Sequence, residues 1–216
     1  MSILHEIEKK ETWGVFLERK IADGYLSATE CGRLKQFIKK ESYRPSVDKL
    51  LAGIPFSFPT KKEISKIGKQ KKRVVYTFKH DENLILKLLT HLLIREYDYL
   101  FSPNLYSFRA NSGVKKAIKK ITSTPHIDDY YSYKIDISNY FNSIDIDKLL
   151  SILEEVFAHD KELYAFTQML LKNPYVKVGK QIIMEKKGVM AGTPIAVFLS
   201  NLYLTDLDQR FDKRDD

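Results

Sequence analysis

Residues 133–145 contain the strongest candidate for catalytic chemistry in the sequence. Asp136 lies at the end of an alternating apolar run and precedes a turn with two aromatic residues, Tyr140 and Phe141. A carboxylate at the end of a strand can bind Mg²⁺ while its backbone stays rigid, and the carbonyl of Ile137 can add a second oxygen ligand. A lone Asp after a strand more often only caps the turn, so the surrounding segment has to decide the assignment.

A second candidate is the basic segment of residues 61–80, which has eight basic residues and one acidic residue. Such a patch on one element attracts phosphates of a nucleic acid or of a nucleotide. A solvated, Lys-rich hairpin without a ligand is the alternative. Residues 122–216 carry 11 basic and 15 acidic residues. The separation of basic and acidic regions favours a site where a polyanion and a metal meet.

The elements that must position these residues are helices and short strands, so the predicted fold class is α+β. Alternation predicts a half-buried strand over residues 132–138, and hairpins are expected over 61–80, with a turn at Gly68-Lys69, and over 175–184, with a turn at Gly179. Ser27 and Glu30 form a capping box before the second helix. Prolines predict a loop over residues 44–60. Apolar periodicity predicts helices over residues 3–20, 28–42, 83–95, 113–121, 145–157, 161–171 and 194–211.

Composition excludes several classes of protein. The chain has 216 residues, 44% of them hydrophobic and 12% aromatic, and a formal net charge of +8, which excludes a disordered chain. The single cysteine, Cys31, excludes a disulfide scaffold and a Cys-rich zinc site and fits a reducing compartment. Neither a signal peptide nor a membrane span is expected, since the longest uncharged stretch, residues 188–205, contains Gly, Pro and Asn. We therefore expect a cytoplasmic protein with no membrane partner.

Residues 133–144 (YKIDISNYFNSI) resemble motif A of reverse transcriptases. Three further blocks in the same order strengthen the resemblance. Residues 72–75 (KRVV) look like the end of the family's fingers hairpin, and residues 102–109 (SPNLYSFR) look like its fingers block. Residues 188–194 (GVMAGTP), with the helix that follows them, look like motif B. The details are most similar to bacterial reverse transcriptases of the retron, abortive-infection and group II intron kind.

The resemblance implies a right-hand polymerase fold with an N-terminal helical extension. Its implied divisions are a helical extension at residues 1–45, fingers at 46–125 and a partial palm with motifs A and B at 126–216. It also implies RNA-directed DNA polymerase activity, in which dNTPs are added to a primer 3′-end by two-metal catalysis. The implied partners are an RNA template, a DNA or RNA primer, dNTPs and two Mg²⁺ ions, with a noncoding RNA as a further candidate.

The resemblance also assigns site residues. Asp136 would be the catalytic residue and would bind metal together with the Ile137 carbonyl. Phe141, five residues later, would be a steric gate that excludes a 2′-hydroxyl, although ordinary core packing is its alternative. Arg109 is a candidate nucleic-acid contact that we expect to act mainly as a brace of the fingers. The implied dNTP-binding positions are Lys66, Lys72, Arg73, Phe141, Ala191 and Gly192, and the other implied nucleic-acid contacts are Lys69 and Lys71.

Two departures from the family pattern qualify these expectations. Motif B usually reads Pro-Gln-Gly, whereas this chain has Met190-Ala191-Gly192, and Ala191 cannot make the contact of the usual Gln. The family's motif C, an aromatic-x-Asp-Asp hairpin with the remaining metal carboxylates, is absent, and residues 213–216 (KRDD) do not match it. We therefore expect this chain alone to be inactive. It would be the fingers and first half of the palm of a longer protein or a truncated product; a split enzyme completed by a partner chain is less favoured.

Two other functions compete with the polymerase. A non-catalytic scaffold that binds nucleic acid and keeps the fold is favoured for this chain by the missing motif C. The retained Asp136 and Phe141 favour a polymerase for the complete protein, from an antiphage-defence or mobile-element system. An RNA-dependent RNA polymerase is disfavoured, because an aromatic gate rejects ribonucleotides.

Overall fold

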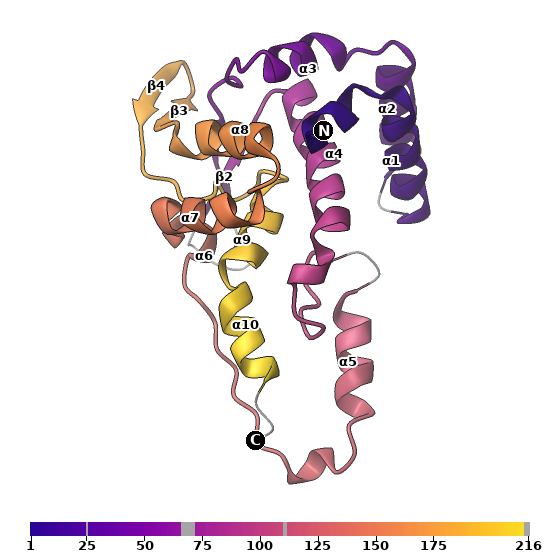
Figure 1. Cartoon of the computed structure of the whole chain (residues 1–216), viewed down its shortest axis with the longest axis vertical. Coiled ribbons are helices and arrows are strands. Elements are labelled where there is room, and N and C mark those ends of the chain that lie inside the picture. The colour runs from indigo at the N-terminus through magenta and orange to yellow at the C-terminus, as the bar shows by residue number, and fades with distance from the viewer. Residues whose placement is uncertain (25, 66–71, 110–111, 214–216) are drawn as a thin grey trace.

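The computed structural model describes residues 1–24, 26–65, 72–109 and 112–213. A long central helix, α4, separates the N-terminal helices from a small sheet and the helices next to it (Figure 1). At the other end of the molecule, helix α5 and the chain that follows it form a narrow projection (Figure 1). This is the mixed α+β architecture that the sequence predicts.

Ten α-helices and four strands lie within the described residues. The helices are α1 (Lys10–Ala22), α2 (Ala28–Lys39), α3 (Arg44–Leu51), α4 (His80–Glu96), α5 (Val114–Thr122), α6 (Tyr140–Ser143), α7 (Ile146–Val156), α8 (Lys161–Lys172), α9 (Ala196–Tyr203) and α10 (Thr205–Asp212). The strands are β1 (Thr60–Ser65), β2 (Lys72–Thr77), β3 (Tyr175–Val178) and β4 (Gln181–Met184). No helix in this part of the chain is long and apolar enough to cross a membrane.

The N-terminal region confirms one prediction and corrects two. The capping box is present, because Ser27 accepts the backbone N–H of Glu30 and the Glu30 carboxylate accepts the Ser27 N–H. The predicted helix over residues 3–20 is instead a 3-10 helix, Ile3–Glu8, followed by α1 after an extended Lys9. The predicted loop over 44–60 is wrong at its start, where α3 forms. Proline lies in the first turn of α3, where its missing N–H costs no hydrogen bond.

The sheet joins two hairpins in the order β2-β1-β3-β4. Strands β1 and β2 pair antiparallel over six residues, and β3 and β4 pair antiparallel over four, so both predicted hairpins are confirmed. The predicted turn at Gly68-Lys69 lies outside the described residues. Between the hairpins, β1 and β3 are parallel and share the pair Thr60↔Lys177. The Lys177 N–H also donates to the Pro59 carbonyl at 2.9 Å.

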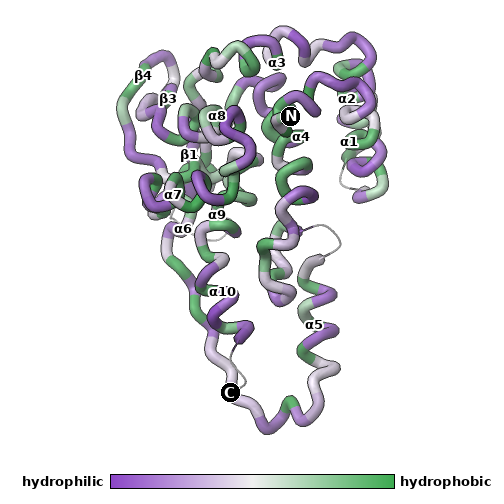
Figure 2. Tube along the Cα trace, in the orientation of Figure 1, coloured by the Kyte–Doolittle hydropathy of each residue, from purple (hydrophilic) through white to green (hydrophobic). Residues whose placement is uncertain are grey.

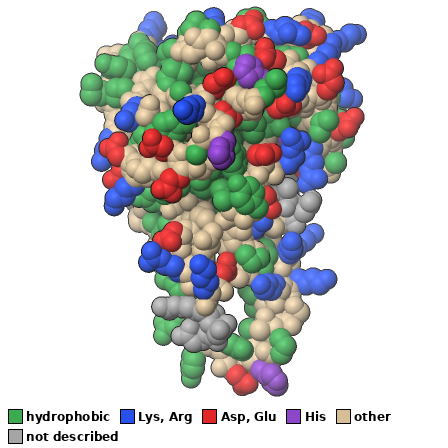
Figure 3. Space-filling view, in the orientation of Figure 1, with side chains coloured by type: hydrophobic (Ala, Val, Ile, Leu, Met, Phe, Trp, Pro, Cys, Tyr) green, Lys and Arg blue, Asp and Glu red, His purple; other side chains and the backbone are tan. Residues whose placement is uncertain are grey.

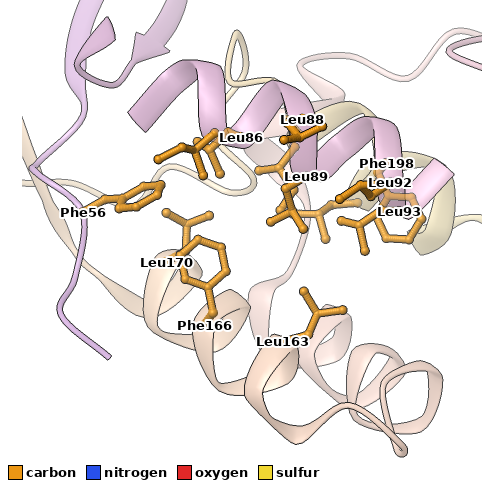
Figure 4. Packing of buried hydrophobic residues seen from close by; sticks show 14 of the residues in the cluster. Phe56, Leu86, Leu88, Leu89, Leu92, Leu93, Leu163, Phe166, Leu170 and Phe198 are labelled. Atoms are coloured by element: carbon orange, nitrogen blue, oxygen red, sulfur yellow. The ribbon is translucent and has the colours of Figure 1, made fainter. Parts of the chain in front are cut away.

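Helix α4 is the centre of the hydrophobic core, as its leucine periodicity predicts. Hydrophobic stretches predominate along α4, and hydrophilic residues interrupt them (Figure 2). Phe166 and Leu170 of α8 reach towards Leu86 of α4, and Phe198 of α9 lies beside Leu93 (Figure 4). Burial of each such side chain contributes about 1.5–3 kcal/mol. The buried residues of α4 are Glu82, Leu84, Ile85, Leu86, Leu88, Leu89, Thr90, Leu92 and Leu93.

The prediction of a half-buried strand over residues 132–138 is wrong. The segment is extended, but no described strand pairs with it, and every residue from 131 to 139 is exposed. Tyr131, Tyr133 and Ile135 are 96%, 92% and 84% exposed. Alternation fixes which side chains share a face, but a strand also needs a neighbour for its hydrogen bonds. The predicted helix over 194–211 is divided at Leu204 into α9 and α10.

Candidate functional site

A tightly turned loop, residues 188–192, connects the elements that carry most of the predicted site residues. Three of its residues, Gly188, Met190 and Gly192, have left-handed backbones with φ of 51°, 60° and 97°. A left-handed conformation is strained for a non-glycine residue, so Met190 is held there by its surroundings. Its side chain is fully buried. The loop is therefore a fixed part of the core that presents its backbone to two neighbours.

The first neighbour is the turn after Asp136. The Val189 N–H donates to the Phe141 carbonyl at 3.0 Å. A Cβ placed on Gly188 would lie 2.3 Å from that carbonyl oxygen and 2.8 Å from the Asn142 carbonyl carbon, closer than atoms can approach. Only glycine permits this approach, so Gly188 fixes the Phe141 backbone against the loop. The Phe141 ring is half-buried and packs against the core.

The second neighbour is strand β2 of the basic hairpin. The Tyr76 N–H donates to the Ala191 carbonyl at 2.8 Å. A Cβ on Gly192 would lie 2.9 Å from the Cβ of Val75. Because side chains two residues apart on a strand share a face, Arg73 projects from the same face of β2 as Val75. The loop thus places Phe141, Ala191, Gly192 and the face of β2 that carries Arg73 next to one another.

Two further contacts hold the same elements. The Tyr140 hydroxyl donates to the Ser200 carbonyl of α9 at 2.6 Å, and burial raises the pKa of that hydroxyl. Glu185, after β4, accepts from Lys61 of β1 at 2.7 Å and from the Tyr76 hydroxyl of β2 at 3.2 Å. Burial, followed by the charge of Glu185, raises the pKa of Tyr76. These contacts tie the motif A turn to α9 and the two hairpins to each other.

The described residues do not gather other metal-binding side chains into a cluster with Asp136. Asp136 and Ile137 lie in the exposed extended segment, and no group of three His, Cys, Asp or Glu side chains in the described part of the chain is arranged to hold a metal ion. Mg²⁺ needs several oxygen ligands, usually including one or two carboxylates and substrate phosphates. Asp136 and the Ile137 carbonyl fit one edge of such a shell. They do not fit a site for two ions without further carboxylates.

The remaining predicted residues have different surroundings. Lys72 pairs with Glu63 across the hairpin at 3.2 Å, and both side chains are exposed. Arg109 forms a bidentate ion pair with Asp98, at 2.8 and 2.7 Å, and donates to the Ser102 carbonyl at 2.5 Å. These hydrogen bonds lower the pKa of Asp98 and raise that of Arg109. These contacts hold Arg109 against Asp98 and Ser102, as expected for a residue that braces the fingers. A contact between Arg109 and nucleic acid stays a prediction. Lys66, Lys69 and Lys71 lie outside the described residues.

Sequence reasoning missed Gly188, Tyr76 and Glu185 as positioning residues. Gly188 was part of the motif B resemblance but had no role, and its approach to Phe141 depends on two segments 47 positions apart in the sequence. Tyr76 and Glu185 come from different hairpins, and only the sheet order brings them together. The available sequence signal for Gly188 was a lone glycine between Lys187 and Val189.

The comparison with protein families agrees with the geometry. A family profile described as "Reverse transcriptase (RNA-dependent DNA polymerase)" matches residues 60–215, from the first strand of the basic hairpin to beyond α10. The match covers most of the chain, and the chain belongs to this family. Membership implies RNA-directed DNA polymerase activity, with a nucleic-acid template and primer and dNTPs. Comparison with curated proteins found no match.

Proposed function

We propose that this chain carries the fingers and the first half of the palm of an RNA-directed DNA polymerase, which adds dNTPs to a primer when the rest of the palm is supplied. One observation carries the proposal: the 188–192 loop joins the turn after Asp136 to strand β2 by two backbone hydrogen bonds and two close glycine contacts. Three blocks of the family pattern, far apart in sequence, thereby meet at one place. That is the arrangement a nucleotide pocket needs.

The side chains around this loop suit a deoxynucleoside triphosphate. Arg73 is exposed on the face of β2 that contacts Gly192, and its guanidinium can hold phosphate oxygens by charge-assisted hydrogen bonds. The Phe141 backbone is held through its carbonyl, and its half-buried ring packs against the core. We propose Phe141 as the gate against a 2′-hydroxyl. Lys66, Lys72, Ala191 and Gly192 complete the proposed dNTP set, and Lys69, Lys71 and Arg109 are proposed nucleic-acid contacts.

The proposed divisions follow the same logic. Residues 1–45 form a helical extension, 46–125 the fingers and 126–216 a partial palm. Asp136 supplies one carboxylate, and the two Mg²⁺ ions require others from the rest of the palm or from a partner chain. The intact mass of the protein in its native cell tests this: a mass well above 25.2 kDa supports a longer polymerase. The similarity to bacterial retron, abortive-infection and group II intron enzymes supports an origin in antiphage defence or a mobile element.

A non-catalytic scaffold is the second candidate. The exposed position of Asp136 favours it for this chain, because no group of three His, Cys, Asp or Glu side chains among the described residues could hold a metal ion. In a scaffold, Asp136 would have no effect on any reaction, whereas the basic hairpin would still bind nucleic acid.

Replacement of Asp136 by Ala in the complete protein separates the two candidates. We expect Asp136→Ala to abolish primer extension with dNTPs on an RNA template and to leave template-primer binding nearly unchanged. Asp129→Ala is the matched control, since Asp129 is an exposed acid of the same connecting segment outside the motif. Full activity in Asp136→Ala would refute the catalytic assignment.

The gate has its own test in the same assay. Phe141→Ala should admit rNTPs, because the space under the sugar is opened, whereas Phe141→Tyr keeps the ring and should keep the discrimination. Equal dNTP/rNTP selectivity in wild type and Phe141→Ala would show that Phe141 belongs only to the core.

A further inference from the structure

A large groove lies on the side of α4 away from the sheet, between α4 and the N-terminal helices α1 and α2. Its volume is about 980 Å³. The groove is also lined by residues 108 and 109 of the fingers block, by residue 112 and by residues 194 and 197 around the start of α9. The N-terminal helices, the fingers block and the motif B helix therefore all contribute residues to the groove. Of the residues assigned to the site proposed above, Arg109 alone lines this groove.

The groove is basic. Its charged lining residues are Arg19, Lys20, Arg33, Lys87 and Arg109, with the acids Asp23 and Glu30. Asp23 pairs with Arg19 at 3.1 Å, and Glu30 is engaged in the helix cap with Ser27. Within the described residues, Arg33 and Lys87 form no ion pair, although their charges help to lower the pKa of Glu30 after its hydrogen bonds to Ser27.

The position of Lys87 is informative. It is the one exposed residue between buried neighbours in residues 84–90 of α4, so the groove opens where the core helix carries a cation. His91, one turn later, also lines the groove. Burial lowers the pKa of His91, and Lys20, Arg95 and Arg19 lower it further. The imidazole therefore experiences the positive potential that a phosphate would experience there.

An aromatic ring completes the lining. Phe108 is 54% exposed and has a left-handed backbone with φ of 58°. Non-glycine residues rarely adopt that conformation, which costs about 1–3 kcal/mol and commonly marks a functional constraint. The same loop is braced by the Arg109–Asp98 ion pair. A fixed, accessible ring beside cations is the combination that binds unpaired bases by stacking and their phosphates by charge.

We propose that this groove binds a single-stranded polynucleotide, with phosphates at Arg33, Lys87 and Lys20 and a base stacked on Phe108. The cations come from three different helices, which suits a chain of phosphates better than one phosphate group. The accessible ring requires an unpaired base, so a duplex does not satisfy the site. This inference goes beyond the proposed function, because strand binding here needs neither a metal nor Asp136.

The test measures fluorescence anisotropy of a labelled single-stranded RNA, about twelve nucleotides long, with the full chain over a series of salt concentrations. Arg33→Ala/Lys87→Ala should lower the steepness of log K against log salt by about 1.4, since each lost phosphate contact on a single strand contributes about 0.7. Lys35→Ala/Lys39→Ala removes the same charge from exposed positions of α2 outside the groove and should leave the slope nearly unchanged.

Phe108→Ala should weaken binding about 5- to 150-fold without changing the salt slope, whereas Phe108→Tyr should bind as the wild type does. An abasic strand with the same phosphates should show the same loss with the wild-type chain. Circular dichroism checks that the variants fold. We expect them to fold, because the substituted residues are exposed. Equal salt slopes for the two double variants, unaltered binding by Phe108→Ala, or no binding by the wild type would overturn the proposal. None of these measurements depends on primer extension.

Discussion

Replacement of Gly188 by Ala should destabilise the chain far more than an ordinary Gly→Ala change. The alanine would have to adopt the φ of 51°, and its Cβ would lie 2.3 Å from the Phe141 carbonyl oxygen. A left-handed backbone costs an L-residue about 1–2 kcal/mol, and forcing extra volume into a packed core costs about 1–3 kcal/mol. We therefore expect the free energy of unfolding to fall by about 2–5 kcal/mol.

Gly179→Ala is the matched control. Gly179 lies in the β3–β4 turn with a φ of 59°, but a Cβ there would meet no atom within 4 Å. It should cost only the backbone strain, about 1–2 kcal/mol. The difference between the two variants therefore isolates the contact with Phe141.

Urea unfolding followed by the fluorescence of Trp13 measures both variants. Trp13 is the only tryptophan, is fully buried and stacks on Tyr43 at 4.7 Å between ring centroids, so its emission should report loss of the core. If Gly188→Ala loses no more stability than Gly179→Ala, the loop does not press on the Phe141 backbone, and the description of the site is wrong.

Three further predictions concern single side chains. Asp98→Asn should lower stability at pH 7, and the difference from wild type should narrow as pH falls below about 3.8, because Arg109 lowers the folded-state pKa of Asp98 and its stabilisation is lost when the carboxylate is protonated. Burial lowers the pKa of Lys187, so the unfolded state binds more protons and the stability of wild type relative to Lys187→Met should rise as pH approaches 10.5. Tyr140→Phe removes the hydrogen bond to the Ser200 carbonyl and should cost about 1 kcal/mol in urea unfolding.

The sequence predicts the elements whose signals are local. The leucines of α4 repeat with helical spacing, and both hairpins alternate around turn residues, so these elements form where expected. The helix Arg44–Leu51 escapes the sequence prediction because Pro45 resembles a helix breaker, although proline is tolerated in the first helical turn. The strand at 132–138 was over-predicted because alternation says nothing about whether a neighbouring strand exists.

The candidate site was predictable by residue type but not by arrangement. Asp136, Phe141 and Gly192 stand out in one linear pattern, whereas the approach of Gly188 to Phe141 and of Gly192 to Val75 arises only from packing. The basic groove was harder still to foresee. Arg33 and Lys87 belong to different helices, and neither lies in the basic segment that charge counting identifies.

The exposed segment after α5 has a consequence for handling the protein in solution. Tyr131, Tyr133 and Ile135 project from an extended backbone whose hydrogen-bonding groups face no described strand, and α5 nearby exposes Val114 and Ile118. Hydrophobic side chains and Lys and Arg side chains both appear on the narrow projection (Figure 3). An unpaired, apolar strand is a template for intermolecular β-pairing. Expressed by itself, the chain should therefore self-associate through this projection as its concentration rises. A strand that paired with the exposed segment should prevent this self-association.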